Sequence, residues 1–251
     1  MDRRKKDLLI RAQNISVVYN RRRSLFNSDP YTALENVSLE LRSGESLGVI
    51  GRNGVGKTTL LRVLGNIISP NGGSIENFDA TTALLSLQVG FDSHASGRTN
   101  ILLSALLLGY TRREIEDRTD KIIAFSELGD FIDQPLAGYS MGMRARLGFS
   151  ICYFMRPDVL LIDEALGVGD LEFREKSTEA MQQKIKSDQT VVLVSHSVNT
   201  IRQLCNRAVW IEDGVSKMEG GVDEVVEAYE TFVRHHPRTS GQMNACRKNR
   251  S

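Results

Sequence analysis

The stretch Gly51–Thr59 constrains the fold more than any other part of this sequence. It reads Gly-Arg-Asn-Gly-Val-Gly-Lys-Thr-Thr and fits the pattern in which Gly-x-x-x-x-Gly-Lys is followed by Ser or Thr. Glycines allow a backbone to wrap a polyphosphate with its N–H groups pointing inward, and the dipole of a following helix adds positive potential. The flanks agree, since Glu45–Ile50 is typical of a buried strand and Thr59–Leu64 of a helix start. This phosphate loop therefore predicts an α/β fold; the alternative is an ordinary glycine-rich turn.

The residues of the phosphate loop are expected to make different contacts with a nucleotide. Lys57 is expected to reach the β- and γ-phosphates as a point charge, and the Thr58 hydroxyl to ligate Mg²⁺. A nucleotide and Mg²⁺ are the ligands that such a loop implies. The other residues expected to bind the nucleotide are Gly51, Arg52, Asn53, Gly54, Val55, Gly56 and Thr59.

Composition limits the classes of protein that the chain can represent. Its 251 residues suffice for one large α/β domain, or for a core with a subdomain. The net charge of +1 gives no global field that favours nucleic acid or a membrane surface as a partner. No apolar run approaches the roughly 18 residues that span a bilayer, and the basic start lacks the apolar core of a signal peptide. Three widely spaced cysteines outside metal-ligand patterns favour a reducing, cytosolic setting: Cys152, Cys205 and Cys246.

Hydrophobic periodicity predicts a single domain. Residues 8–19 and 32–41 are expected to be strands joined by a basic loop over 21–30, and strands alternate with helices again after residue 159. The end of the chain has too few large apolar residues to offset the entropy of ordering, so a disordered tail is expected. The expected segments are a basic arm at 1–7, one domain at 8–233 and a basic tail at 234–251.

A helical subdomain is expected within that domain, from about 98 to 155. Thr99 or Asn100 is expected to cap its first helix. Thr111 and Glu114 have the spacing of a capping box for its second helix.

Two carboxylates end the apolar run Val159–Ile162. The carboxyl end of a parallel strand is where α/β sheets bind ligands. Asp163 is expected to hold Mg²⁺ through water, and Glu164 to accept a proton from an attacking water. The alternative is a helix N-terminus that carries acidic residues.

The segment Tyr139–Met143, Tyr-Ser-Met-Gly-Met, resembles the signature loop Leu-Ser-Gly-Gly-Gln of ABC-type ATPases. The resemblance covers about residues 8–233 and implies a P-loop NTPase fold with a RecA-like core, an antiparallel β subdomain and a helical subdomain. It also implies that this segment acts in trans, on ATP bound by a second copy of the domain, through Ser140, Met141, Gly142 and Met143. The elements that occur in the family's order are the phosphate loop, this segment, Asp163, Glu164, Asp170, Ser195 and His196.

The resemblance implies roles for four further residues, each with an alternative. Asp170 matches the loop that touches the partner subunit, or it only caps the helix that follows. His196 matches the switch histidine that contacts the γ-phosphate and serves catalysis with Glu164, or it is structural. Tyr19 matches the aromatic residue on which adenine stacks, or it packs into the core. Gln88 matches the glutamine that contacts Mg²⁺ and the attacking water, or it is a surface glutamine, and both interpretations stay open.

The departures from the common pattern indicate a subfamily. Met141 and Met143 replace the small residue and the Gln of the signature, and Ala165–Asp170 replaces Pro-Thr-x-x-Leu-Asp. Together with Gly97–Ile101 and Phe125–Asp133, these features resemble the ATP-binding subunits of bacterial polysaccharide exporters. The resemblance implies that the chain powers export of a lipid-linked polysaccharide, O-antigen-like, capsular or teichoic acid, across the inner membrane. The extra carbohydrate-binding domain of the longer members is not expected here.

Two partners are implied by this resemblance. One is a second copy, in a head-to-tail dimer that encloses ATP, and the other is a separate polytopic membrane permease; nucleic acid is not expected. The chain is expected to lie peripherally on the cytoplasmic face of the bacterial inner membrane, with the helical subdomain as its coupling surface. Three alternatives remain: an ABC ATPase for another lipid or small molecule, a soluble ABC ATPase acting on DNA or ribosomes, and a subunit that binds ATP without turnover.

Overall fold

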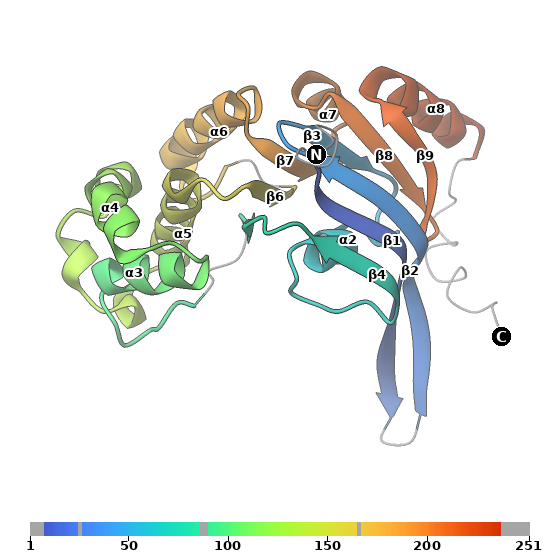
Figure 1. Ribbon diagram of the computed structural model, residues 1–251. Coiled ribbons are helices and arrows are strands. Elements are labelled where there is room, and N and C mark those ends of the chain that lie inside the picture. The colour runs from blue at the N-terminus through green and yellow to red at the C-terminus, as the bar shows by residue number, and fades with distance from the viewer. Residues whose placement is uncertain (1–7, 25–26, 86–89, 165–166, 237–251) are drawn as a thin grey trace.

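The computed structural model describes residues 8–24, 27–85, 90–164 and 167–236, which form two β-sheets flanked by helices (Figure 1). An antiparallel sheet has the order β2-β1-β4, and a larger sheet has the order β5-β6-β7-β3-β8-β9. Neighbours in the larger sheet are parallel, except for β8 and β9. The strands are β1 (Leu8–Ser24), β2 (Asn27–Arg42), β3 (Ser46–Ile50), β4 (Gly72–Asn77), β5 (Thr82–Leu84), β6 (Val159–Asp163), β7 (Thr190–Val194), β8 (Arg207–Glu212) and β9 (Val215–Gly221).

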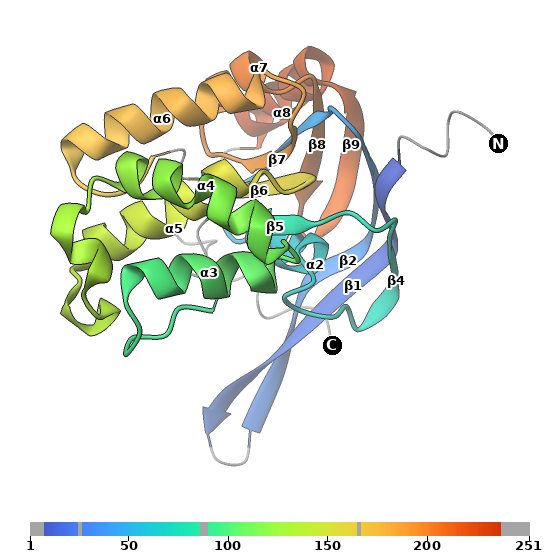
Figure 2. The ribbon, with the colours of Figure 1, turned by 60° about the vertical axis from the view of Figure 1, so that its left-hand side comes forward.

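The helices of the C-terminal half cover the face of the larger sheet that points away from the antiparallel sheet, the helix after the phosphate loop lies between the two sheets, and other helices build a separate subdomain beside them (Figure 2). None of the helices in the described ranges has both the length and the hydropathy that crossing a bilayer requires. The α-helices are α2 (Lys57–Leu64), α3 (Gly97–Leu107), α4 (Arg112–Ser126), α5 (Met141–Met155), α6 (Leu171–Ile185), α7 (Val198–Leu204) and α8 (Val222–His235), and the 3-10 helices are η1 (Gly129–Asp133) and η2 (Leu136–Gly138).

The larger sheet is buried on both faces because its strands are continuous apolar runs. Successive side chains of a strand point to opposite faces, so β7 places Val192 and Val194 in one core and Val191 and Leu193 in the other. The first core fills the space between the two sheets and includes the apolar side of α2. The second core packs α6, α7 and α8 on the opposite face. This layering fixes the carboxyl ends of β3, β6 and β7 side by side, since the three strands are adjacent and parallel.

The predicted helical subdomain has its own core. Ile101 of α3, Ile115 and Ile122 of α4 and Leu147 of α5 are fully or almost fully buried in it. The predicted capping box is confirmed, because Thr111 Oγ1 accepts from the Glu114 N–H and the Glu114 side chain accepts from the Thr111 N–H.

The predicted cap of α3 is wrong. Ser96 caps the helix by accepting from the Thr99 N–H at 3.2 Å. Asn100 is fully buried, where its Nδ2 donates to the carbonyls of Asp92, Ala95 and Ser96 and its Oδ1 accepts from the Asp92 N–H. A buried amide that satisfies main-chain groups of a loop is a tertiary feature, which spacing alone did not reveal.

The basic loop predicted over 21–30 is also wrong. β1 and β2 stay paired as far as Ser24 and Asn27, with Tyr19 opposite Tyr31 in the ladder. The resulting hairpin projects away from the rest of the molecule in both views (Figures 1 and 2). Its arginines interrupt the period-two apolar pattern on which the strand prediction depended. At the other end, α8 continues to His235, past the predicted domain boundary at 233.

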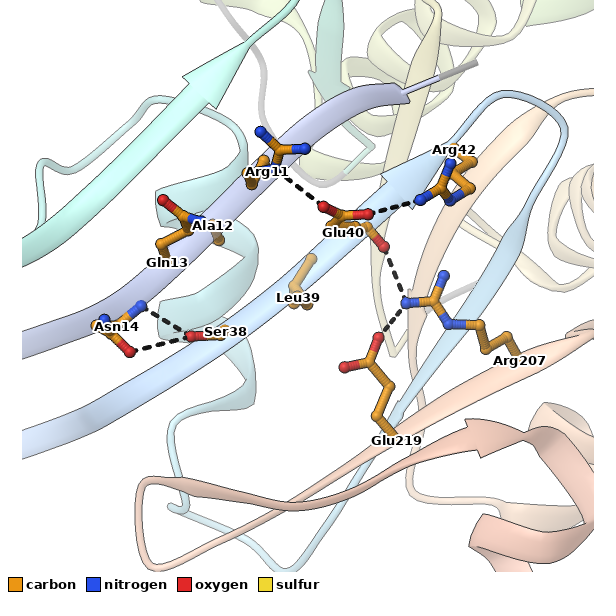
Figure 3. A pocket seen from close by; sticks show the side chains of 10 residues that line it. All are labelled: Arg11, Ala12, Gln13, Asn14, Ser38, Leu39, Glu40, Arg42, Arg207 and Glu219. Carbon is orange, nitrogen blue, oxygen red and sulfur yellow. Dashed lines mark hydrogen bonds and ion pairs between the residues drawn. The ribbon is translucent and has the colours of Figure 1, made fainter. Parts of the chain in front are cut away.

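The two sheets are tied together by charged side chains around a groove of about 550 Å³ (Figure 3). Arg207 donates from Nη1 to both Glu45 carboxylate oxygens at 2.8 and 2.9 Å, and from Nη2 to the Glu40 main-chain oxygen at 2.9 Å. The Glu40 carboxylate pairs in turn with Arg11 at 2.9 Å and with Arg42 at 2.7 Å. Arg207 begins β8 and Glu45 precedes β3, so this groove lies at the amino ends of the parallel strands. The phosphate loop follows the carboxyl end of β3, at the opposite edge.

Candidate functional site

The phosphate loop connects β3 to α2 in a conformation that requires glycine at two positions. Gly51 and Gly56 have φ angles of 148° and 105°, outside the range that other residues favour. A Cβ atom at Gly51 would lie 2.1 Å from the main-chain oxygen of Ile211, and one at Gly56 would lie 2.3 Å from that of Ala33. The glycines of the motif therefore serve close backbone packing against β8 and β2 as well as the turn.

The Lys57 side chain curls back over the phosphate loop. Its Nζ donates to the main-chain oxygens of Gly51 at 2.7 Å and Arg52 at 2.9 Å, and the residue is 5% exposed. Burial lowers the pKa of Lys57, while the negative charges of Glu164 and Asp163 act in the opposite direction. Gly56, at the N-cap of α2, provides no side-chain cap, so the first turn of the helix offers its N–H groups to an anion.

Thr58 and Asp163, the two predicted Mg²⁺-holding residues, lie side by side. The Thr58 Oγ1 atom donates to Asp163 Oδ1 at 3.3 Å, which joins the first turn of α2 to the end of β6. A hydroxyl and a carboxylate are hard oxygen donors of the kind that Mg²⁺ accepts, alongside water and phosphate oxygens. The pair therefore fits the expected ion.

Glu164 and His196 also come together. His196 Nε2 lies 2.5 Å from Glu164 Oε1, and both side chains are about half exposed, at 46% and 47%. Glu164 has a φ of 64°, an uncommon conformation for a residue other than glycine, and its N–H donates to the main-chain oxygen of Val194 at 2.9 Å. The hydrogen bond to β7 holds this turn, so the carboxylate leaves the buried strand and faces solvent beside the histidine.

The predicted trans-acting segment, Ser140–Met143, forms the start of α5. Ser140 is its N-cap, with Oγ accepting from the Met143 N–H at 3.2 Å. Met141 is 88% exposed, whereas Met143 packs against the core of the helical subdomain. A Cβ atom at Gly142 would meet only Ser140 Oγ, at 3.8 Å, so the surface here is open. The segment thus presents its first turn outward, and its action on a partner's ATP stays a prediction.

Three further candidates have mixed outcomes. Asp170 caps α6, since its Oδ1 accepts from the Phe173 N–H at 3.1 Å; whether it also contacts a partner is untested. Tyr19 is half-buried against the core between the sheets, which supports the packing interpretation and leaves adenine stacking untested. Gln88 lies outside the described residues.

Sequence reasoning missed a tyrosine that touches the phosphate loop. The Tyr31 hydroxyl donates to the main-chain oxygen of Gly54 at 2.7 Å. Tyr31 sits on β2 opposite Tyr19, a register that depends on the hairpin predicted as a loop. A strand assignment for 21–30 is the signal that could have brought this residue into view.

Comparison with known proteins decides the family. The family model described as ABC transporter matches residues 34–167 of the chain. The chain belongs to the ABC transporter family. Curated relatives match most of the chain.

Two relatives illustrate the similarity. The teichoic acids export ATP-binding protein TagH of Lactococcus lactis is 43% identical over 208 residues, 83% of this chain and 44% of that protein. The O-antigen export system ATP-binding protein RfbB of Klebsiella pneumoniae is 40% identical over 206 residues, 82% of this chain and 84% of that protein. This ABC family member therefore spans less than half of the first relative and most of the second.

Solved structures confirm the predicted fold class. The ATP-binding cassette MJ0796, in a dimeric post-hydrolysis state with ADP and Pi, matches with a TM-score of 0.67 at 20% identity. The match covers 85% of this chain and 99% of the MJ0796 chain. An ATP-binding subunit of an ABC transporter has a TM-score of 0.70 at 18% identity, with coverage of 88% and 93%.

Proposed function

We propose that this chain is the ATP-binding and hydrolysing subunit of an ABC exporter for a lipid-linked polysaccharide, O-antigen-like, capsular or teichoic acid. The observation that carries the ATPase part is the convergence of three groups at the carboxyl ends of β3, β6 and β7. These are Lys57 within the phosphate loop, Thr58 with Asp163, and Glu164 with His196. The substrate class is supported by TagH and RfbB, at 43% and 40% identity, whose names specify export of teichoic acids and O-antigen.

The phosphate loop binds the triphosphate. The Lys57 ammonium is already held at the centre of the loop by two main-chain oxygens, so little reorganisation is needed for it to meet phosphate oxygens. The uncapped first turn of α2 adds main-chain donors. Thr58 and, through water, Asp163 would hold Mg²⁺, which would neutralise negative charge at the phosphate oxygens.

Glu164 acts as general base in the hydrolysis step. Its exposed carboxylate accepts a proton from the water that attacks the γ-phosphate. His196, 2.5 Å away, holds the carboxylate in one direction and reaches the γ-phosphate once the site closes. Both residues stand on turns that follow buried parallel strands, so the rigid sheet sets their separation.

Two copies complete each site. In the proposed head-to-tail dimer, Ser140 and Gly142 of one chain contact the γ-phosphate on the phosphate loop of the other. The outward position of Met141, 88% exposed at the start of α5, supports such a contact. ATP then closes the dimer, and hydrolysis reopens it.

The motion is passed to a separate polytopic membrane permease, which the chain serves from the cytoplasmic face of the inner membrane. Leu106 and Leu107 support the helical subdomain as the coupling surface, because these adjacent leucines at the end of α3 are 46% and 65% exposed.

The test combines turnover with partner capture. Lys57→Ala is expected to abolish ATP hydrolysis, because it removes the positive charge that is held at the centre of the phosphate loop. The tagged chain is expected to copurify with a polytopic membrane protein encoded beside it, and ATPase activity is expected to rise in that complex. Stimulation by DNA or ribosomes in place of the membrane protein would contradict the proposal.

A further inference from the structure

The end of α8 holds the side chain of Arg52, the arginine of the phosphate loop, through two contacts. Arg52 Nη2 donates to the main-chain oxygen of His236, and the guanidinium lies 5.1 Å from the ring centroid of Phe232. On the other side, Arg52 Nη1 lies 3.7 Å from Glu212 Oε1 at the end of β8. The Arg52 and Glu212 side chains are only 15% and 2% exposed, so the guanidinium is enclosed between β8 and α8. We call this arrangement the arginine clamp: Arg52, Glu212, Phe232 and the main chain of His236.

The aromatic part of the clamp is fixed in place. The Phe232 ring lies 4.9 Å from the Trp210 ring of β8 and stacks on His236 at 4.5 Å. Trp210 is itself buried against α8 through Tyr229, at 5.7 Å. These contacts dock the last turn of α8 on β8 and give Arg52 a rigid surface to rest on.

Arg52 connects this clamp to the phosphate loop. Its main-chain oxygen accepts from Lys57 Nζ at 2.9 Å, while its side chain is held by β8 and α8. The loop around Arg52 has positive φ angles at Gly51, Gly54 and Gly56. Without an anchor, the backbone of such a glycine-rich loop would have more conformational freedom than that of most loops. An anchored side chain in the middle of such a loop reduces the number of conformations that compete with the phosphate-binding one.

We propose that Arg52 is a positioning residue and that the docked end of α8 sets the nucleotide affinity of the phosphate loop. The inference rests on the proposed binding of ATP at this loop. Coupling between two sites is reciprocal, so a nucleotide on the loop must stabilise the end of α8 by the same factor. A partner or chain segment that displaces residues 232–236 therefore lowers nucleotide affinity without touching the site itself.

Nucleotide titration of clamp variants tests the first half. Phe232→Leu keeps an apolar side chain but removes the aromatic face, and Arg52→Gln removes the charge that rests on it. Each is expected to weaken binding of fluorescent ATP by about three- to ten-fold. The double variant is expected to be no weaker than the more affected single variant, because both changes release the same clamp. Arg52→Lys, which keeps the charge and loses the planar fork, is expected to lie between wild type and Arg52→Gln.

Arg202→Gln is the matched control. Arg202 of α7 pairs with Asp223 and Glu230 of α8 at 3.3 and 3.7 Å, so the change loosens α8 at a different place and leaves the clamp intact. It is expected to bind ATP as wild type does. Wild-type affinity in both Phe232→Leu and Arg52→Gln, or full additivity in the double variant, would overturn the inference. Failure of the wild-type chain to bind ATP would instead overturn the proposed function.

Hydrogen–deuterium exchange tests the reciprocal half. Saturating ATP is expected to slow amide exchange over 229–236 in the wild-type chain. In Arg52→Gln at a concentration that also saturates the site, this protection is expected to disappear while protection of the phosphate loop remains. Equal protection of 229–236 in both proteins would show that the clamp does not carry the coupling.

Discussion

Glu164 unites an unusual backbone conformation with an exposed carboxylate, which makes it the most sharply testable residue of the site. Glu164 directly follows a buried strand, and the surrounding structure holds its φ of 64° and its 2.5 Å contact with His196. Glu164→Gln keeps the shape and removes the proton acceptor. Steady-state phosphate release is expected to slow roughly 10²- to 10⁴-fold, with ATP still bound. A wild-type rate in this variant would exclude Glu164 as the base.

A residue far from the site gives the chain a pH-dependent stability. Lys184 of α6 is 8% exposed, its Nζ donates to the Tyr153 main-chain oxygen, and burial lowers its pKa from 10.5 to about 8. The charge of Arg156 contributes to this lowering of the pKa, and Cys152 opposes it. Between pH 8 and 10.5 the unfolded chain binds more protons at this site than the folded chain, so stability rises with pH there.

Above pH 9 the two buried thiols lower the stability as the pH rises, which opposes the effect of Lys184. Burial raises the pKa of Cys152 from 9.0 to about 11 and that of Cys205 to about 12, so unfolding releases their protons in this range. Comparison with Lys184→Met cancels the contribution of Cys205 and most of that of Cys152, because the Lys184 charge also lowers the pKa of the Cys152 thiol. Relative to that variant, the unfolding free energy of the wild type is expected to rise by about 2–3 kcal/mol from pH 7 to pH 10, measured by urea denaturation. Lys186→Met, at an exposed position of the same helix end, is the control. A pH-independent difference between wild type and Lys184→Met would contradict the prediction.

At the scale of elements, two polar residues at the start of α3 do different work. Ser96 caps the helix with one hydrogen bond. Buried Asn100 forms hydrogen bonds with three carbonyls and one N–H of the preceding loop. Ser96→Ala is expected to cost about 1 kcal/mol of unfolding free energy. Asn100→Ala is expected to cost more, since each buried partner left unsatisfied costs about 1–3 kcal/mol. Urea denaturation measures both, and a cost for Asn100→Ala equal to that of Ser96→Ala would contradict its role as loop organiser.

The same elements show what a sequence reveals. Thr111 and Glu114 are three residues apart, and their capping box was predictable because both partners lie within one helical turn. The phosphate loop and the carboxylates after β6 were predictable for a similar reason, since a strand followed by fixed residue types defines each. Tyr31 and Phe232 were not, because they reach the phosphate loop from β2 and α8 through register and docking. Spacing patterns carry local geometry, while contacts between distant elements depend on the packed fold.

At the scale of the whole molecule, the two halves of the proposed composite site lie on different parts of the surface of the chain. The phosphate loop belongs to the layer of sheets and α2, and Ser140 belongs to the helical subdomain that lies beside it (Figure 2). Two apolar side chains stand exposed near the predicted dimer-contact residues: Met141 at 88% and Leu171, next to Asp170, at 75%. A pair of such exposed groups is expected where a second copy covers them.

Dimerisation in the Glu164→Gln background tests this arrangement. Slow hydrolysis is expected to trap the ATP-bound dimer, which sedimentation velocity separates from the monomer. Met141→Glu in the same background is expected to keep the chain monomeric with ATP, because a charge would be buried in the interface without a partner. Leu107→Glu places the same charge on a side chain of α3 that is 65% exposed, and is expected to dimerise normally because α3 lies outside the proposed interface. If Met141→Glu dimerises to the same extent as Leu107→Glu, the start of α5 does not face a second copy. Ser140 then cannot complete the ATP site on the phosphate loop of that copy.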